Sequence, residues 1–437
     1  MLKIYNALTN QVEDFKPIHH SKVNMYVCGP TVYDDIHIGN GRPVVFFDLV
    51  KRYLTYLGYE VIYASNITDV DDKIIEKARL LNQDALEVSK HFADRFLDVV
   101  KRVGSKAFDH TPYATDYINE MITYIQELMD KGFAYETSSG VYFSVSKLDS
   151  YGKLSNQKSD ELLQGVRIEL EKDKVDQRDF AIWKKTTDGL NYMSPWGQGR
   201  PGWHTECAVM NHELFGGLID IHGGGFDLKF PHHENEIAQS MAHDHHHLAT
   251  YWMHVGRLDF GKEKMSKSLG NDIKLKDLLE NYDGGAYRLM LLAHHYRAPI
   301  AFTTELMEQY QKTYDKISNT LNKWNFKFRS MGMNTKFNIE DYQKRLNDLI
   351  TLMDNDFDTP NVISLIDATV KDLNKEEDIE LFIKLKGILN VLGIEPKINE
   401  PEQIDLKTYE DWLNARNNKD FAKADELRNI LSQKGWI

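Results

Sequence analysis

The first part of the chain alternates short apolar runs with a longer segment of helical spacing. Residues 22–30 (KVNMYVCGP) form a short apolar stretch ending in glycine and proline, which is typical of a buried strand. In residues 45–57, apolar side chains recur at steps of three and four, and Gly58 stands where such a helix would end. Residues 60–72 (EVIYASNITDVDD) are a second strand-like run leading into a polar turn. This order predicts a βαβ unit, and therefore a parallel sheet with a crossover helix.

The later parts of the chain follow other patterns. Between about 113 and 200 this rhythm is lost, and SSGVYFSVSKL and DFAIWKK predict strands within an insertion in the sheet domain. After about 300, apolar residues recur at steps of three and four, and the tail predicts two helices broken near Asn418. Thr359 followed by Pro360 predicts a helix start with Thr359 as the N-cap. The pattern therefore predicts an α/β domain followed by helices.

Composition and charge narrow the class of protein. The 437 residues are 42% hydrophobic and 27% charged, as in an ordinary globular protein of several domains. The net charge is -13, so a nucleic-acid partner would have to meet a local basic surface. The N-terminus lacks the pattern of a signal peptide, and no apolar run approaches the roughly 18 residues of a membrane span. We therefore expect a cytoplasmic protein without membrane contact.

Two loops have residues suited to phosphate. The loop before the first helix lies at the carboxyl end of the predicted sheet, where such folds bind ligands. In HIGN (37–40), His37 and Asn40 could donate to phosphate oxygens, Gly39 would allow close approach, and a helix N-terminus adds positive potential. GKEKMSKSLGN (261–271) has three lysines that could close over a triphosphate. For each loop alone, a simple solvated turn explains the residues equally well.

The two cysteines belong to a possible metal-ligand set. His232 and Glu236 are four residues apart in a helix-like segment and therefore share one helix face. Cys28 ends the first strand, and Cys207 lies at the edge of a helical stretch. Two thiolates, an imidazole and a carboxylate are suitable ligands for four-coordinate zinc. The alternatives are two buried thiols and a surface ion pair. The run HDHHHL (243–248) is expected to be a solvated surface rather than a metal site.

Several familiar motifs are present only in part. GQGRPG (197–202) does not follow an apolar strand and contains a proline, which excludes a dinucleotide fingerprint. GRLDFGKE (256–263) has glutamate where a P-loop needs serine or threonine. HGGG (222–225) is not accompanied by a G-x-S-x-G nucleophile elbow, and HHENE is not H-E-x-x-H. Esterase and zincin chemistry are thereby excluded.

In this order, HIGN and KMSKS resemble the two signatures of class I aminoacyl-tRNA synthetases. Five further blocks resemble the cysteinyl-tRNA synthetase family in particular: MYVCGPTVYDDIHIGNGRP, NITDVDDKII, SPWGQGRPGWHTECAVM, DIHGGGFDLKFPHHENEIAQS and YWMHVGRLDFGKEKMSKSLGN. The resemblance extends from about residue 2 to the C-terminus and is densest at 23–75 and 180–300. The first signature ends in Asn40 rather than histidine, a variation that this family tolerates.

The resemblance implies an α/β fold, with a Rossmann-like parallel-sheet catalytic domain, an insertion, and an all-α C-terminal helical bundle. The implied divisions are the first half of the catalytic domain (1–112), a connective insertion (113–200), the second half of the catalytic domain (201–255), a stem-contact region with the KMSKS loop (256–300) and a helical domain that binds the tRNA and its anticodon (301–437). A monomer is expected.

The resemblance also implies an activity, in which ATP activates L-cysteine and the cysteinyl group passes to the 3′-terminal adenosine of tRNA(Cys). One zinc ion per chain would bind the substrate thiolate, and magnesium would accompany ATP. The implied metal ligands are Cys28, Cys207, His232 and Glu236. The implied amino-acid pocket contains Thr68, Trp203 and His222, and the implied ATP site contains His37, Gly39, Asn40, Gly224, Asp227 and Lys267. The implied catalytic residues are His37, Asn40, Lys264 and Lys267.

Two other functions remain as alternatives. A related ligase joins cysteine to an amino sugar in mycothiol synthesis and shares the sheet, the zinc and the adenylate step. The retained Glu236 and the helical tail argue against that ligase, as does the Lys-, Asn- and Ile-rich composition. A non-catalytic tRNA- or zinc-binding protein derived from a synthetase is the second alternative. It would have no chemical need for both HIGN and KMSKS.

Overall fold

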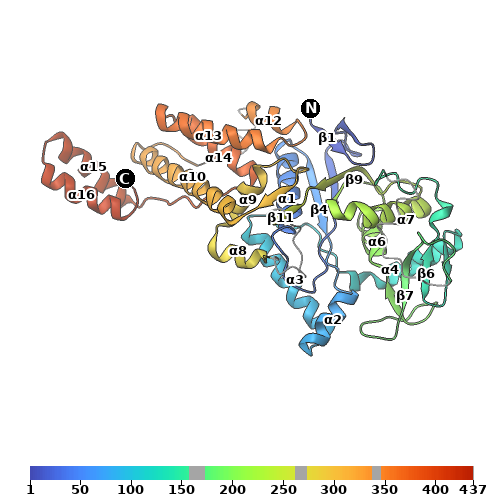
Figure 1. Ribbon diagram of the computed structural model, residues 1–437. Helices are drawn as coiled ribbons and strands as arrows, with labels where there is room; N and C mark the ends of the chain where they lie inside the picture. The colour runs from blue at the N-terminus through green and yellow to red at the C-terminus, as the bar shows by residue number, and fades with distance from the viewer. Residues whose placement is uncertain (157–172, 261–272, 337–345, 437) are drawn as a thin grey trace. The chain divides into compact units, whose positions relative to one another are not determined.

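The predicted βαβ unit is present near the start of the chain. In the computed structural model, β3 (Lys22–Val27) and β4 (Glu60–Ser65) are parallel neighbours, and α1 (Gly41–Tyr56) crosses between them (Figure 1). Gly58 has a φ of 96°, a left-handed conformation that ends α1 as the sequence predicts. The structure describes residues 1–156, 173–260, 273–336 and 346–436.

The sheet continues on the other side of β3. Strands β9 (Ile219–Gly225) and β10 (Ala249–Val255) extend it in the order β10–β9–β3–β4, with all strands parallel. The chain leaves β3 toward β4 and later returns to β9 on the opposite side of β3. The carboxyl ends of β3 and β9 therefore form a topological switch point, where open α/β sheets bind ligands.

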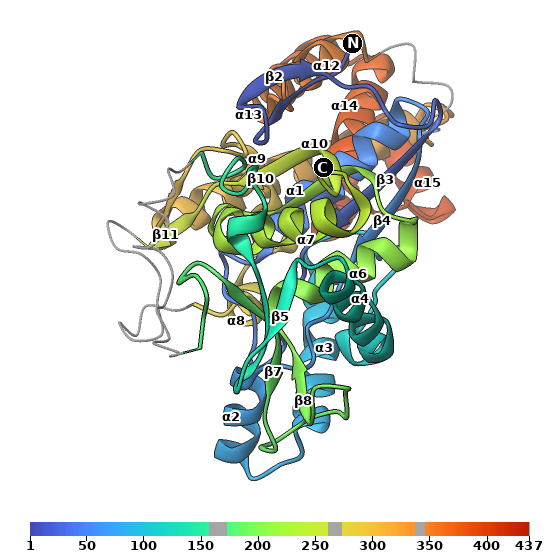
Figure 2. The same ribbon diagram turned by 90° about the vertical axis from the view of Figure 1, so that its right-hand side faces the viewer.

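A smaller antiparallel sheet separates the two halves of the parallel sheet in the sequence. It follows α4 (Ile118–Asp130), has the order β5–β6–β7–β8 and leads into α6 (Trp203–Phe215). Its strands are β5 (Ala134–Glu136), β6 (Gly140–Phe143), β7 (Phe180–Lys185) and β8 (Gly199–Pro201). Helix α7 (Glu234–Asp244) then connects β9 to β10. Figure 2 shows α4, α6 and α7 beside one another, and the three helices are in contact.

These elements belong to the first of two units into which the chain divides: Met1–Asn281, Tyr296–Phe302 and Asp354–Phe357. The other elements of this unit are β1 (Lys3–Asn6), β2 (Gln11–Asp14), α2 (Asp72–Leu81), α3 (Ala85–Arg102), β11 (Leu258–Phe260), α8 (Leu275–Asn281) and β12 (Ile300–Phe302).

Two glycines allow the strand ends to approach their neighbours closely. A Cβ atom at Gly223 would lie 2.1 Å from Cζ of Phe47, so α1 packs directly against the backbone of β9. A Cβ at Gly29 would lie 1.7 Å from the backbone oxygen of Asn66, just beyond β4. Any side chain at either position would separate the elements that carry the candidate site.

The second unit comprises Tyr282–His295, Thr303–Met353 and Asp358–Ile437, and its described residues are helical apart from connecting loops. Its helices are α9 (Gly284–Leu292), α10 (Thr304–Ser330), α12 (Asn347–Met353), α13 (Thr359–Glu376), α14 (Ile379–Leu392), α15 (Gln403–Asn417) and α16 (Phe421–Gln433). The predicted break in the tail is present at Asn418.

One predicted helix start is displaced by a residue. Asp358, not Thr359, is the N-cap of α13, because its carboxylate accepts a hydrogen bond from the backbone N–H of Asn361. The observed parallel sheet, antiparallel insertion and helical C-terminal region agree with the expected fold class. The five-part domain division stays a prediction. In the part of the chain that the structure describes, no helix is both long and apolar enough to cross a membrane.

Candidate active site

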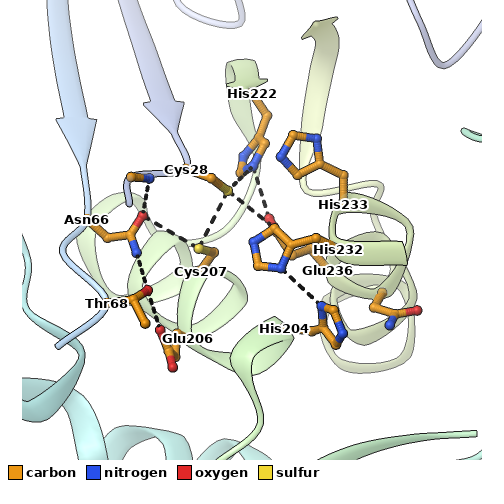
Figure 3. Close-up of polar contacts among 12 residues, drawn as sticks. Cys28, Asn66, Thr68, His204, Glu206, Cys207, His222, His232, His233 and Glu236 are labelled. Atoms are coloured by element: carbon orange, nitrogen blue, oxygen red, sulfur yellow. Dashed lines mark hydrogen bonds and ion pairs between the residues drawn. The ribbon is translucent and has the colours of Figure 1, made fainter. Parts of the chain in front are cut away.

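The four predicted metal ligands lie together beyond the ends of β3 and β9 (Figure 3). Cys28 directly follows β3, His232 lies in the turn before α7, and Glu236 lies in the first turn of α7. Cys207 lies inside α6 rather than at the edge of a helix, because α6 begins four residues earlier than Cys207. Sγ of Cys28 is 3.5 Å from Sγ of Cys207 and 3.3 Å from Oε1 of Glu236. Nε2 of His232 is 2.9 Å from the same Oε1.

The donor atoms and their burial suit a metal ion. Zinc bonds of about 2.0–2.3 Å place tetrahedral ligands roughly 3–4 Å apart, which is close to the distances observed here. Cys207, His232 and Glu236 are fully or almost fully buried. Nε2 of His232 and Oε2 of Glu236 lie within ion-pair distance of a partner, yet neither has a hydrogen bond of good geometry within the described residues. Buried polar atoms of this kind require a partner, and a cation would supply one.

Two further histidines border the same cluster. Nε2 of His222 is 3.4 Å from Sγ of Cys28 and 3.0 Å from Oε2 of Glu236. His222 and His233 could replace Cys207 and His232 in a second possible ligand set with Cys28 and Glu236. The sequence analysis placed His222 in the amino-acid pocket and did not identify His233. The adjacent histidines of HHENE (232–236) were the signal that could have suggested His233.

The charges within the cluster stabilise a thiolate. Burial by itself would raise the pKa of Cys207, but the hydrogen bond from Cys28 and the positive charge of His232 outweigh burial and lower this pKa to about 6. Burial likewise opposes a charge on His232, yet the carboxylate of Glu236 raises the pKa of its imidazole to about 10. Burial raises the pKa of Cys28 well above its ordinary value.

A chain of buried polar residues supports Cys207 from behind. Oδ1 of Asn66 accepts a hydrogen bond from the backbone N–H of Gly29 at 2.8 Å, and Sγ of Cys207 lies 3.6 Å from the same oxygen. Nδ2 of Asn66 donates to Oγ1 of Thr68 at 3.2 Å, and that hydroxyl donates to Oε2 of Glu206 at 2.7 Å. Thr68 therefore connects the segment after β4 with α6. The sequence analysis did not identify Asn66 or Glu206, because neither shows a distinctive spacing.

His232 has its own supports. A ring nitrogen of His204 lies 3.0 Å from Nδ1 of His232, and the indole of Trp203 stacks on the same imidazole at 4.1 Å. Burial lowers the pKa of His204 well below its ordinary value, so its ring stays neutral beside the charged His232. Trp203 is 37% exposed. It therefore lies between the metal-ligand cluster and solvent.

A cavity of about 350 Å³ opens beside the cluster at the carboxyl ends of β3, β9 and β10. Its lining includes the predicted site residues Cys28, His37, Gly39, Asn40, Trp203 and Asp227. Thr68, His222 and Gly224 are buried beneath this lining rather than part of it. The structure thus places the first signature, the tryptophan and one cysteine around a single space.

The first signature forms a hydrogen-bonded turn. Nδ1 of His37 accepts from the backbone N–H of Gly39 at 3.0 Å, so the neutral ring carries its proton on Nε2. The backbone N–H of His37 donates to Oδ1 of Asn40 at 3.3 Å. Asn40 is the N-cap of α1, although its side chain does not cap the helix. These bonds hold the imidazole as a donor beside the N-terminus of α1.

The predicted lysines Lys264 and Lys267 lie outside the described residues. The segments that flank them lie at the cavity, since Asp259 and Lys274 are part of its lining. The backbone N–H of Ile38 donates to the carbonyl of Ile273 at 3.0 Å, which attaches the later flank directly to the first signature. Lys274 also lies 3.7 Å from Asp34. The sequence analysis did not identify Lys274 as a cavity residue.

Comparison with known proteins gives a consistent result. Residues 14–312 match the family model described as the tRNA synthetases class I (C) catalytic domain. A protein of Acholeplasma laidlawii named "Cysteine--tRNA ligase" is 60% identical over 437 residues, covering the whole of both chains. Proteins of the same name from Onion yellows phytoplasma and Staphylococcus epidermidis are 48% and 42% identical, over all of this chain and 100% and 97% of theirs.

Solved structures share the fold at low sequence identity. Methionyl-tRNA synthetase of Mycobacterium tuberculosis, in complex with methionyl-adenylate, matches with a TM-score of 0.62 and 13% identity, over 92% of this chain and 96% of that one. A putative arginyl-tRNA synthetase from Campylobacter jejuni matches with a TM-score of 0.58 and 14% identity, over 89% and 96%.

Proposed function

This chain belongs to the cysteine-tRNA ligase family of class I tRNA synthetases, and we propose how its residues attach L-cysteine to tRNA(Cys). The observation that carries the proposal is the buried cluster of two thiols, an imidazole and a carboxylate beside a cavity lined by the first signature. Neither the amino-sugar ligase nor a non-catalytic protein is favoured by these relatives.

The amino-acid side of the site selects the substrate. Cys28, Cys207, His232 and Glu236 would hold zinc, which when bound supplies an acceptor for the thiolate of the substrate L-cysteine. Serine differs by one atom, and a hydrophobic pocket discriminates such near-isosteres poorly. A thiolate binds zinc far better than a hydroxyl does, so serine would be rejected without a separate editing site.

The residues around the metal position it and the substrate. Asn66 holds the Cys207 sulfur and the end of β3 in one network. Trp203 covers His232 on the cavity side and would form one wall of the amino-acid pocket. His222, between Cys28 and Glu236, would complete the polar end of that pocket. Thr68 acts through Glu206 and α6 rather than by touching the substrate.

The nucleotide side of the site is formed by the first signature and by the turns after β9 and β10. His37 presents its Nε2 proton as a donor for an ATP phosphate, and Asn40 and Gly39 place the N-terminus of α1 beside it. Asp227 and the backbone at Gly224 would contact the adenosine. Magnesium would accompany the triphosphate, and membership of this family supports that role.

The reaction has two displacement steps. A carboxylate oxygen of L-cysteine attacks the α-phosphorus of ATP, and the bond to the bridging oxygen breaks to release pyrophosphate. The 2′-hydroxyl of the terminal adenosine of tRNA then attacks the carbonyl carbon of cysteinyl-adenylate, and AMP leaves. His37, Lys264 and Lys267 would stabilise the charge that develops on the phosphate oxygens, so the protein contributes positioning and electrostatics.

The helical region that starts near residue 301 would bind the tRNA, including its anticodon, and the chain would act as a monomer. Because the net charge is -13, this binding must use local basic surfaces. Lys312, Lys316 and Lys323 lie along one stretch of α10 with a single carboxylate, Asp315, among them, and this stretch would provide such a surface.

A charging assay tests the proposal. Purified protein would be incubated with ATP, magnesium, bulk bacterial tRNA and labelled cysteine, with labelled serine as the parallel substrate. We expect cysteine, and not serine, to become attached to tRNA. Cysteine-dependent pyrophosphate exchange without charging would contradict the role of tRNA as acceptor and would favour the amino-sugar ligase. Equal charging with serine would contradict the role of zinc as selector.

A further inference from the structure

A second cluster of metal-binding side chains lies outside the candidate active site. It consists of His212 in the last turn of α6, with His243 and Asp244 in the last turn of α7. The run HDHHHL, which contributes His243 and Asp244, is expected from its sequence to be a solvated surface rather than a metal site. The side chain of His243 is only 7% exposed, because it packs between α4 and α6, whereas His245 is exposed.

The two imidazoles converge on one carboxylate. Nδ1 of His212 lies 3.1 Å from Oδ2 of Asp244, and Nδ1 of His243 lies 2.7 Å from Oδ1 of the same residue. One donor atom from each of the three residues lies within 4.8 Å of the others. Two imidazole nitrogens and a carboxylate oxygen form a ligand set that binds zinc and neighbouring dications while leaving a coordination position for water.

His243 also has the outer contact that metal-bound histidines usually make. Its Nε2 lies 2.5 Å from Oε2 of Glu127 on α4, so the ring can donate there while Nδ1 faces Asp244. A carboxylate that accepts from the distal nitrogen fixes the ring orientation of a metal ligand and raises its basicity. Tyr124 stacks on the same ring with centroids 3.9 Å apart and an interplanar angle of 19°. The imidazole is therefore held in one orientation from three sides.

The local electrostatics favour a cation that can enter from solvent. His212 and Asp244 have side chains that are 31% and 16% exposed, so the cluster is accessible. Both residues lie at or near helix C-termini, where the backbone carbonyls carry partial negative charge. Burial opposes the charge of Asp244, but its contacts with His243 and His212 lower the pKa of this carboxyl, which keeps it ionised.

We propose that His212, His243 and Asp244 form a second metal site, which binds a first-row transition-metal dication of the zinc class. The ion would lie between the two Nδ1 atoms and the carboxylate of Asp244, in place of the contacts that now join them. His246 is not a ligand. Its Nδ1 accepts from the backbone N–H of Leu248 at 3.2 Å, and its Nε2 is 4.0 Å from Oδ2 of Asp244.

Such an ion would fasten the helices that carry the candidate active site. Helix α6 carries Cys207 near its start and His212 near its end, and α7 carries Glu236 and His243 in the same way. The contact between Glu127 and His243 would also join α4 to these two helices, and α4 leads directly into the antiparallel insertion. This inference does not depend on the proposed function, since it concerns only metal binding at the far ends of these helices.

Cobalt titration of the metal-free, full-length chain tests the inference. Thiolate ligands give cobalt an intense charge-transfer absorption that a site with only imidazole and carboxylate ligands lacks. We expect the wild type to bind two equivalents, of which one lacks the thiolate absorption. The Cys207→Ser variant should keep that second equivalent. The His212→Asn/His243→Asn double variant should lose it and retain the thiolate-bound ion.

Three single variants sharpen the test. His245→Asn changes an exposed histidine of the same run in a left-handed conformation that asparagine tolerates, and it should still bind two equivalents. Asp244→Asn keeps the side-chain shape and should lose the second equivalent of cobalt. This variant keeps the proposal testable if the double variant does not fold. Glu127→Gln should weaken the affinity for the second equivalent about 10- to 100-fold, which is the usual cost of losing a residue that supports a metal ligand. A wild type that binds one equivalent, or a second one only in the millimolar range, would overturn the proposal.

Discussion

The two polar clusters of α6 and α7 use similar chemistry in different surroundings. In the buried cluster, Glu236 lies 3.0 Å from His222 and 2.9 Å from His232, and all three side chains are at most 1% exposed. In the outer cluster, Asp244 contacts His212 and His243 at 3.1 and 2.7 Å, yet its side chain is 16% exposed. Each carboxylate thus serves two imidazoles, and burial is the main difference.

The difference in burial determines what each cluster can do. Water partly solvates the outer carboxylate, so its contacts contribute little to stability and can exchange with a metal ion. The buried cluster has no such solvent, and each of its charges depends on the others. Buried groups of this kind have strongly shifted pKa values, which is a property of catalytic and binding sites. The following predictions test this contrast.

The largest effect is expected for Cys207→Ser. A hydroxyl is a poor zinc ligand, so zinc affinity and the rate of cysteine activation should both fall by more than about 100-fold. Loss of a residue that only supports a metal ligand already costs ~10- to 100-fold, and loss of a ligand itself should cost more. Zinc content and cysteine-dependent pyrophosphate exchange measure this. The fold should remain, as circular dichroism can check. Full activity at substoichiometric zinc would refute the metal role of Cys207.

A matched pair of amide substitutions compares the two carboxylates directly. In metal-free protein, Glu236→Gln should lower the free energy of unfolding by about 3–5 kcal/mol, because it leaves buried charge unpaired. Asp244→Asn should cost no more than about 1 kcal/mol, because the carboxylate itself and its partner His212 are partly solvated. Urea denaturation of both variants beside the wild type measures the difference. Equal losses would show that burial is not what separates the clusters.

Acid should destabilise the buried side selectively. Burial lowers the pKa of His254, which contacts His233 at 2.8 Å, to about 3, below the value of roughly 6.5 in an unfolded chain. Between pH 3 and 6.5 the unfolded state binds more protons than the folded state does. The contribution of His254 to the free energy of unfolding is therefore complete above about pH 6.5 and is lost as the pH falls toward 3. The loss is about 1.4 kcal/mol per pH unit. Urea midpoints at several pH values should therefore fall less steeply for His254→Gln, and parallel slopes would contradict this assignment.

A smaller effect than that of Glu236→Gln is expected at Asn66. Asn66→Ala leaves the backbone N–H of Gly29 without its acceptor and removes a contact to Cys207, which should cost about 1–3 kcal/mol of stability. Zinc affinity should fall about 10- to 100-fold through the lost outer contact. Asn191→Ala, at a half-exposed asparagine outside the cluster, is the control. If both variants bind zinc equally well, the network through Asn66 does not support the metal site.

Much of the fold was predictable because its signals are local. The apolar run before Cys28, the helical spacing that ends at Gly58 and the second apolar run predict β3, α1 and β4 without reference to distant residues. The helix start at Thr359 was misplaced by one residue because adjacent polar side chains compete for the N-cap, and only the hydrogen bond to Asn361 decides between them.

The candidate site was predictable only in part. Cys28 and Cys207 were its strongest signals because the chain contains no other cysteines, and His232 and Glu236 share a helical spacing. The supports at Asn66, Glu206 and His204 have no distinctive spacing. These residues could not be recognised from the sequence because they are defined by contacts between separate segments. The Thr68–Glu206 and Asn66–Cys207 contacts, for example, each join residues that are more than 100 positions apart.

The order of the elements, the two signatures and the residue types that can bind phosphate or zinc are all readable from the sequence. Spacing and side-chain chemistry are properties of the chain that do not depend on its folded path. Only the tertiary structure decided which histidines are buried, because burial is set by packing between elements. The same residue type is enclosed at His233, half-enclosed at His212 and exposed at His245. Packing of α4, α6 and α7 therefore turned part of a histidine run into a candidate metal site.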